Sequence, residues 1–264
     1  EVPRMVDASV PMTAPDVRQI SRADVTSALR AGLADFQKAP MLSLAFGAVF
    51  SVAGIGLALL LLQFGVGYWL LPLAAGFPLI GPFAAVGLYE ISRRLEAGEP
   101  LHLRPILAAG FRSPHGQLPL FAVLAILFLF AWLVLARVIF AVSFGTTSMT
   151  NVMTSLEVFL TPSGLIMLAV GSVVGAALAS LLFAISVVGV PLLVDRDVDV
   201  VTAIITSVRA TLENQGVMLF WGLCVAVATI VAMLPLFLGM ILVFPVLGHT
   251  SWHLYRALIP DGTR

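Results

Sequence analysis

The stretch APMLSLAFGAVFSVAGIGLALLLLQFGVGYWLLPLAAGFPLIGPFAAVGLY, residues 39–89, runs for 51 residues without a charged side chain. A helix needs about 20 apolar residues to cross the hydrocarbon core of a bilayer, so this stretch is long enough for two crossings. Similar uncharged stretches recur at 113–136, 158–194 and 214–255. The whole chain is 60% apolar and 11% charged, with a mean hydropathy of +1.06, far outside the usual soluble range. The sequence therefore predicts an all-α membrane protein with several spans.

Turn signals and stretch lengths predict six transmembrane helices. Gly65 and Gly67 divide the first stretch into spans near 41–62 and 68–88. A third span is expected at about 118–138 and a fourth at about 164–194. The 42 residues of 214–255 accommodate two short spans if the chain turns near Pro235 and Gly239. The residues between the third and fourth spans, about 140–162, then form the one longer external segment.

The distribution of Lys and Arg supports this topology. Positively charged residues gather on the cytoplasmic side of membrane proteins. With six spans, 13 of the 14 Lys and Arg residues fall on one side, and Arg137 alone falls on the other. A single crossing in 214–255 would place Arg256 and Arg264 on the wrong face. We therefore expect both termini in the cytoplasm.

A threefold pattern suggests that the six helices form three repeated hairpins. Short amphipathic patterns at 29–33, 107–111 and 208–212 each precede an odd-numbered span. Such helices are expected to lie in the membrane surface. Each even-numbered span contains a proline, Pro78, Pro191 or Pro245, which kinks a helix by leaving a carbonyl without its partner. We expect one domain over 21–264, preceded by a flexible segment over 1–20 that lacks the apolar core of a signal peptide.

Residues 81–100, GPFAAVGLYEISRRLEAGEP, with Asp35, Phe36 and Pro40 ahead of them, resemble a bacterial family of integral membrane proteins called domain of unknown function 2189. The resemblance covers most of the chain from about residue 20 and implies no established catalytic residue. Some members are labelled as cytochrome oxidase subunit I, a role that requires several intramembrane histidines for two haems and copper. Only His249 and His253, of four histidines, approach the membrane. A catalytic oxidase subunit is excluded, whereas an accessory subunit is not.

Three groups of residues are candidates for specific roles. His249 and His253, four residues apart on one helix face, are weak candidates for a metal or haem site, because no third ligand is evident; an enzyme that uses this pair would contain bound metal or haem. Aromatic and basic residues at span ends are expected to contact lipid at the interface: Tyr89, Arg93, Arg94, Trp252 and Tyr255. Small residues are expected to allow close helix packing: Ser43, Gly47, Gly171 and Gly175.

The absence of chemical motifs limits the function. No charged residue lies near the middle of a predicted span, which argues against proton-driven transport. The sequence has no Walker, Rossmann, nucleophile-elbow or HExxH motif, and its net charge of zero argues against nucleic-acid binding. We expect a noncatalytic protein of the bacterial inner membrane, without a cofactor. It would bind the lipid bilayer and other membrane protein subunits, as an accessory or assembly subunit of a complex such as a respiratory cytochrome oxidase.

The alternative is a small-solute or lipid transporter, suggested by the repeats and the prolines. A transporter should enclose a polar cavity near Pro78, Pro191 and Pro245, whereas a binding subunit should be filled there.

Overall fold

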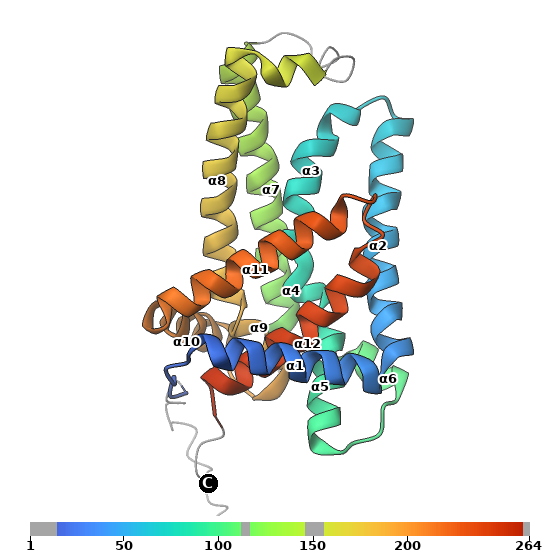
Figure 1. The fold of residues 1–264 in the computed structure, drawn as a ribbon, viewed down its shortest axis with the longest axis vertical. Helices are drawn as coiled ribbons and strands as arrows, with labels where there is room; N and C mark the ends of the chain where they lie inside the picture. Colours follow the sequence, from blue (N-terminus) through green and yellow to red (C-terminus); the bar gives the residue numbers. More distant parts are fainter. Residues whose placement is uncertain (1–14, 112–116, 146–155, 261–264) are drawn as a thin grey trace, which may run out of the picture.

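The computed structural model describes residues 15–111, 117–145 and 156–260, and every regular element in these ranges is a helix (Figure 1). In chain order the elements are α1 (Arg22–Lys38), α2 (Pro40–Gln63), η1 (Gly67–Trp69), α3 (Leu70–Gly76), η2 (Phe77–Ile80), α4 (Gly81–Ala84), α5 (Val86–Ala97), α6 (Leu103–Ala108), η3 (Ala109–Phe111), α7 (Gln117–Phe144), η5 (Leu156–Leu160), α8 (Pro162–Ser186), α9 (Gly189–Asp195), α10 (Val200–Glu213), α11 (Gln215–Met233) and α12 (Met240–Leu258).

Five of the described helical segments are long and apolar enough to cross a membrane: Pro40–Gln63, Gly67–Ala97, Gln117–Phe144, Pro162–Asp195 and Gln215–Met233. The first four correspond to the first four predicted spans. The predicted sixth span is not confirmed, because α12 is not one of the five. Its second half carries His249, Thr250, His253 and Arg256, which lower its hydropathy although only one of them is formally charged.

The hairpin of α11 and α12 reaches only partway along the bundle (Figure 1). Its turn touches α2 near the middle of that helix, where the Ser51 hydroxyl donates to the Phe237 carbonyl at 3.0 Å. Beyond Ser51, α2 continues for 12 residues to Gln63, about 18 Å at the rise of an α-helix. α11 runs obliquely from the end at which α10 lies, and α12 returns to that end. The expected arrangement of three equivalent hairpins is therefore not confirmed.

The turn has unusual backbone geometry. Leu236 and Phe237 have φ angles of 51° and 64°, in the left-handed region that non-glycine residues seldom adopt. The Phe237 ring packs edge-on against Phe77, with 5.6 Å between centroids. It also fills the space beside Gly54, where an added Cβ would lie 2.7 Å from the ring. Packing against two spans thus holds the turn in this conformation.

The second and fourth spans are broken rather than continuous. Between α3 and α5 the chain passes through η2, which contains Pro78, and the short helix α4. α8 ends at Ser186 and α9 begins at Gly189, just before Pro191. At this second break the Ser207 hydroxyl of α10 donates to the Ala184 carbonyl at 2.7 Å and accepts from the Val188 N–H at 3.1 Å. The hydroxyl therefore stands between a donor and an acceptor that would pair with each other in a regular helix.

Close contacts with three neighbours surround α12. A Cβ added to Gly32 of α1 would lie 2.6 Å from the Thr250 nitrogen, and one added to Gly47 of α2 would collide with the Ile241 carbonyl. On the third side, a Cβ on Gly248 of α12 would lie 2.7 Å from the Leu88 side chain of α5. Small residues let helix backbones approach closely in membranes. Glycines thus allow α12 to lie between α1, α2 and α5.

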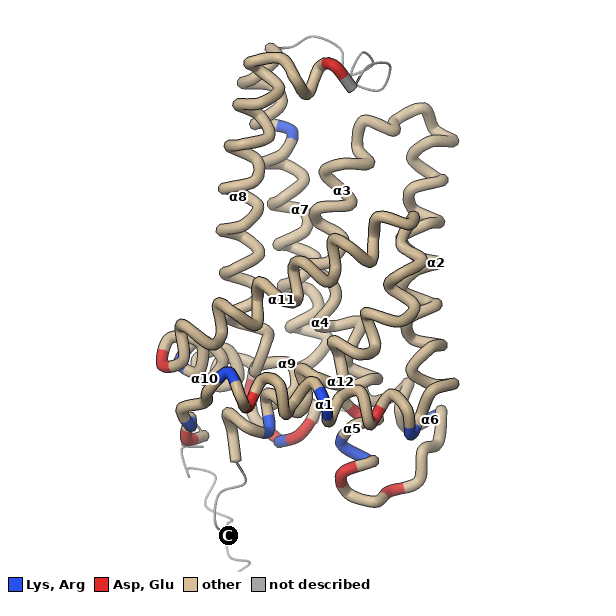
Figure 2. The backbone as a smooth tube through the Cα atoms, viewed as in Figure 1, with Lys and Arg blue, Asp and Glu red and all other residues tan. Residues whose placement is uncertain are grey.

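The charged residues separate strongly along the bundle (Figure 2). Those of α1, α5, α10 and α12 lie at one end, here called the charged end. Among the described residues, Arg137 and Glu157 are the charged residues that lie towards the opposite end. Both ends of the described chain are at the charged end, because the Arg18 N–H donates to the Leu258 carbonyl at 2.8 Å.

The predicted flexible segment 1–20 is described only from residue 15. Asn214, at the junction of α10 and α11, binds this part of the chain: its side chain accepts from the Ile20 N–H at 2.8 Å and donates to the Arg18 carbonyl at 3.2 Å. The remaining residues of the segment, 1–14, lie outside the described residues.

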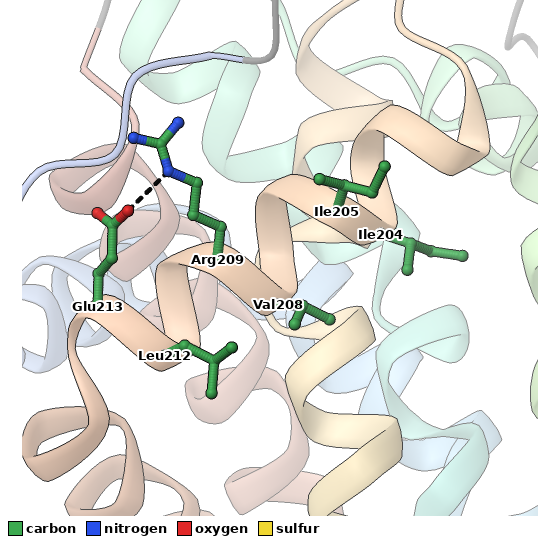
Figure 3. Close-up of a pocket in the computed structure, with 6 residues that line it drawn as sticks. All are labelled: Ile204, Ile205, Val208, Arg209, Leu212 and Glu213. Atoms are coloured by element: carbon green, nitrogen blue, oxygen red, sulfur yellow. Dashed lines mark hydrogen bonds and ion pairs between the residues drawn. The ribbon is translucent and has the colours of Figure 1, made fainter.

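The three amphipathic patterns each coincide with a helix: α1, α6 with η3, and α10. α10 shows the pattern most clearly, with Ile205 and Leu212 more than half exposed and Ala203 and Ala210 fully buried. Figure 3 shows residues of α10 that line a shallow open groove, and the ion pair of Arg209 and Glu213 is part of this lining. Asp199 caps the helix by accepting from the Thr202 N–H at 2.9 Å.

Candidate functional site: a histidine cluster on α12

Five polar side chains from four helices meet near the charged end, and we call them the histidine cluster: Asp35 of α1, Ser43 of α2, Ser92 of α5, and His249 and His253 of α12. His249 is completely buried at their centre, and so are Ser43 and Ser92. Its Nε2 lies 2.9 Å from Ser43 Oγ, and its Nδ1 lies 2.8 Å from Ser92 Oγ. Both ring nitrogens therefore have a hydroxyl partner.

The proton count assigns one tautomer to a neutral His249. Ser43 has a single hydroxyl proton and donates it to the Ala39 carbonyl at 2.8 Å. Ser43 can then only accept from the imidazole, so the proton must lie on Nε2. Nδ1 carries no proton in this tautomer and accepts from the Ser92 hydroxyl. Every buried polar atom of this contact is satisfied while the ring is neutral, which avoids the cost of an unpaired buried group.

Asp35 and His253 link the cluster to the surface. His253 Nε2 lies 2.7 Å from Asp35 Oδ2, and Lys38 lies 3.8 Å from Asp35 Oδ1. Burial raises the pKa of the Asp35 carboxyl, but the hydrogen bond and charge of His253 outweigh burial and hold this pKa below its ordinary value. The Asp35 side chain is 6% exposed and that of His253 is 21% exposed. The cluster thus extends from partly exposed His253 to buried His249.

The described residues do not form a metal site at the cluster. Both ring nitrogens of His249 are hydrogen-bonded to serine hydroxyl groups, and His253 is hydrogen-bonded to Asp35. No group of three or more His, Cys, Asp or Glu residues within the described ranges has an arrangement that could hold a metal ion. His249 and His253 do share one face of α12, as predicted, but Asp35, which the sequence did not suggest, acts there as a hydrogen-bond acceptor.

The residues predicted to contact lipid are mostly turned inward. Tyr89, Arg94, Trp252 and Tyr255 are buried, and the Arg93 side chain is 28% exposed. Glu90 binds both arginines, at 2.8 Å from Arg93 Nε and 2.6 Å from Arg94 Nε. The expectation of an interfacial anchor is corrected for the four buried residues, of which Arg94, Trp252 and Tyr255 have polar partners within the protein.

A second polar network surrounds the end of α12. The Trp252 indole donates to Glu96 at 3.1 Å, and the Tyr255 hydroxyl donates to Asp195 at 2.6 Å. Arg256 joins the two carboxylates, with Nε 3.1 Å from Glu96 and a terminal nitrogen 3.3 Å from Asp195. The end of α12 is therefore bound to both α5 and α9, whose charged residues lie about 100 positions apart in the sequence.

The predicted small packing residues have different surroundings. Gly47 allows the approach of α12, whereas Ser43 contributes a hydroxyl to the histidine cluster. Gly175 faces the ring of Trp132, whose indole donates to the Pro72 carbonyl at 2.6 Å. Gly171 has no neighbour within 4 Å of an added Cβ in the described structure. Trp132 thus joins α7 to both α3 and α8, a contact that the sequence did not suggest.

These features define a helical integral membrane protein with several spans and a polar core at one end. Comparison with protein families adds that residues 70–195 match the model described as predicted integral membrane protein, domain of unknown function 2189. The resemblance noted in the sequence is thus confirmed, over a shorter range than expected. The cluster residues Asp35, Ser43, His249 and His253 lie outside the match, and Ser92 lies within it. No curated protein and no solved structure matched the chain.

Proposed function

We propose that this protein is a noncatalytic subunit of the bacterial inner membrane that binds other membrane proteins, as an accessory or assembly factor of a larger complex such as a respiratory cytochrome oxidase. The observation that carries the proposal is the contrast between a filled interior and long uncovered helix faces.

The interior near the three prolines is packed with apolar side chains. Phe50 stacks on Phe244 with 4.2 Å between ring centroids and contacts Phe77 at 4.6 Å. Phe77 and Phe244 are the neighbours of Pro78 and Pro245 in the chain. Val190 and Leu192, on either side of Pro191, are completely buried. This packing matches the expectation for a binding subunit better than the polar cavity expected of a transporter.

The outer faces of the spans have little cover within the chain. In the most apolar 18-residue windows of α2 and α7, 22% of the residues are buried. Exposed apolar side chains run along both helices, among them Val49, Leu59, Ile126 and Phe130. Lipid covers such faces in any membrane protein, and a partner subunit can replace that lipid where helices fit closely.

The test is extraction of the untagged native protein in mild detergent, followed by mass spectrometry and an optical spectrum of the co-purified material. Recovery of a defined membrane complex in fixed stoichiometry is the expected result, and haem absorption in that complex would identify an oxidase. Recovery of this chain alone, as a monomer or homo-oligomer, would contradict the proposal.

The breaks in the second and fourth spans favour a small-solute or lipid transporter as the second candidate. Discontinuous helices often form binding sites in transporters. If the chain is recovered alone, native mass spectrometry for a retained solute or lipid is the next measurement. A retained ligand lost on Ser207→Ala substitution would support transport through the region of the break.

A further inference from the structure

The histidine cluster has one property that the proposed function does not use. Its hydrogen bonds are complete for a neutral His249, and the cluster is the place where α1, α2, α5 and α12 meet. A change in the protonation of one buried ring therefore acts on the contacts between four helices.

We propose that the histidine cluster is a proton-operated latch, which holds α12 against α1, α2 and α5 while His249 is neutral and loosens this docking when His249 takes up a proton. The inference is independent of whether the partner of the protein is an oxidase or any other complex.

The hydrogen-bond geometry shows what proton uptake would change. A second proton on His249 must reside on Nδ1, which already receives the hydrogen of Ser92 at 2.8 Å. Two hydrogens would then face each other, so Ser92 must rotate its hydroxyl away. The positive charge would also lie in a fully buried site, where an ion loses its hydration. When α12 is undocked and His249 is in contact with water, the charged ring keeps its hydration and its Nδ1 proton does not face the Ser92 hydrogen.

The groups around His249 do not cancel this cost. α2 and α5 present only the neutral hydroxyls of Ser43 and Ser92 to the ring. α1 presents Asp35, which favours a charged His249 but is already bound by His253 and Lys38. The other charged groups nearby on α5 and α9, Glu90 and Asp195, are bound by arginine side chains.

The sign of the pH effect follows from these contacts. An undocked histidine titrates near pH 6.5, the ordinary value for an imidazole. Below this pH the undocked form binds a proton more readily than the docked form, so acid shifts the population towards undocked α12.

Hydrogen–deuterium exchange of the full chain in lipid nanodiscs tests the latch. Exchange in residues 240–258, corrected for the intrinsic pH dependence, should rise as pH falls from 7.5 to 5.5. The His249→Gln variant keeps a donor and an acceptor but does not titrate, so its exchange should be independent of pH over this range. His102→Gln, at the residue before α6 and outside the histidine cluster, is the matched control and should retain the rise.

A second measurement covers the case in which His249→Gln does not fold. In wild-type protein labelled with ¹⁵N-histidine, the His249 signals should change from the Nε2–H tautomer to the doubly protonated ring over the pH interval in which exchange rises. The latch is refuted if exchange rises while His249 stays neutral, if His249 becomes charged without any rise in exchange, or if His249→Gln retains the rise.

Discussion

Single atoms decide how closely α12 approaches its neighbours. The Gly47 hydrogen faces the Ile241 carbonyl, and Gly56, two turns and two residues further along the same helix, faces open space. We predict that Gly47→Ala costs about 1–3 kcal/mol of stability, the usual cost of overpacking, because backbone rather than a flexible side chain must move. Gly56→Ala should have no destabilising effect. Thermal unfolding of both variants in the same detergent checks this, and equal effects would show that α2 and α12 are not packed as described.

The Ser207 hydroxyl is a second single-residue feature. Ser207→Ala should cost about 1–3 kcal/mol, because the Ala184 carbonyl and the Val188 N–H are left in a buried site without their partner. Thr211→Ala on the same helix is the control, since the Thr211 hydroxyl bonds only the Ser207 carbonyl of its own helix. A comparison of unfolding midpoints gives the answer, and a Ser207→Ala variant as stable as Thr211→Ala would rule out the bridging role.

At the scale of elements, the sequence was most informative for helices with local signals. One such signal is Asp199, which precedes the first residue of α10. Its carboxylate accepts hydrogen bonds from Thr202 and thereby sets the start of the helix. Those hydrogen bonds lower the pKa of Asp199 below its ordinary 3.8. The cap is therefore fully present at neutral pH and is lost only as pH falls below about 3.8, through the pKa of the folded state.

The cap yields a prediction for α10 alone. Asp199→Ala should weaken the helix by about 1 kcal/mol, and Asp199→Asn should retain most of the capping because asparagine is an equally good N-cap residue. Amide exchange in residues 200–206 measures the difference at pH 7. As the pH is lowered below 3.8, exchange in the wild-type protein should move towards that of the alanine variant, whereas capping by the asparagine variant should not titrate.

Elements that depend on distant contacts were not predictable from one sequence. Asp35 and His253 are 218 residues apart, and a single chain gives no signal that they pair. Ser43 was identified as a small residue, but its hydroxyl bond to His249 could not be inferred from its size. Trp252 and Tyr255 were assigned to the lipid interface by residue type, whereas their position inside the charged end depends on how α12 is inserted between its neighbours.

At the scale of the whole molecule, the first five predicted spans each correspond to a described helical segment long and apolar enough to cross a membrane, whereas the sixth span is not confirmed. Residues 214–255 are uncharged and long enough for two short crossings, but length does not specify tilt. The contact between Phe237 and Ser51 places the turn near the middle of α2. The positive-residue count is unaffected, because a hairpin that enters and returns leaves Arg256 on the same side as two full crossings would.

Cysteine labelling distinguishes the two topologies. In a Cys224→Ala background, we expect Leu236→Cys at the turn to react with a membrane-impermeant thiol reagent from neither side, because a turn that contacts the middle of a spanning α2 would lie within the bilayer. Glu99→Cys at the charged end and Ser163→Cys at the start of α8 are the controls, and they should react from opposite sides. Reaction of Leu236→Cys from the side of Ser163→Cys would establish six complete spans.

The position of α12 between α1, α2 and α5 also has a consequence for the order of events during synthesis. Asp35, Ser43 and Ser92 are all made before His249 and His253, which provide their contacts. While the chain is still being extended, these polar groups lack the two histidines as partners. Maturation of the charged end therefore waits for the last helix, and a nascent chain halted before α12 would present an open polar surface on which quality-control factors can act.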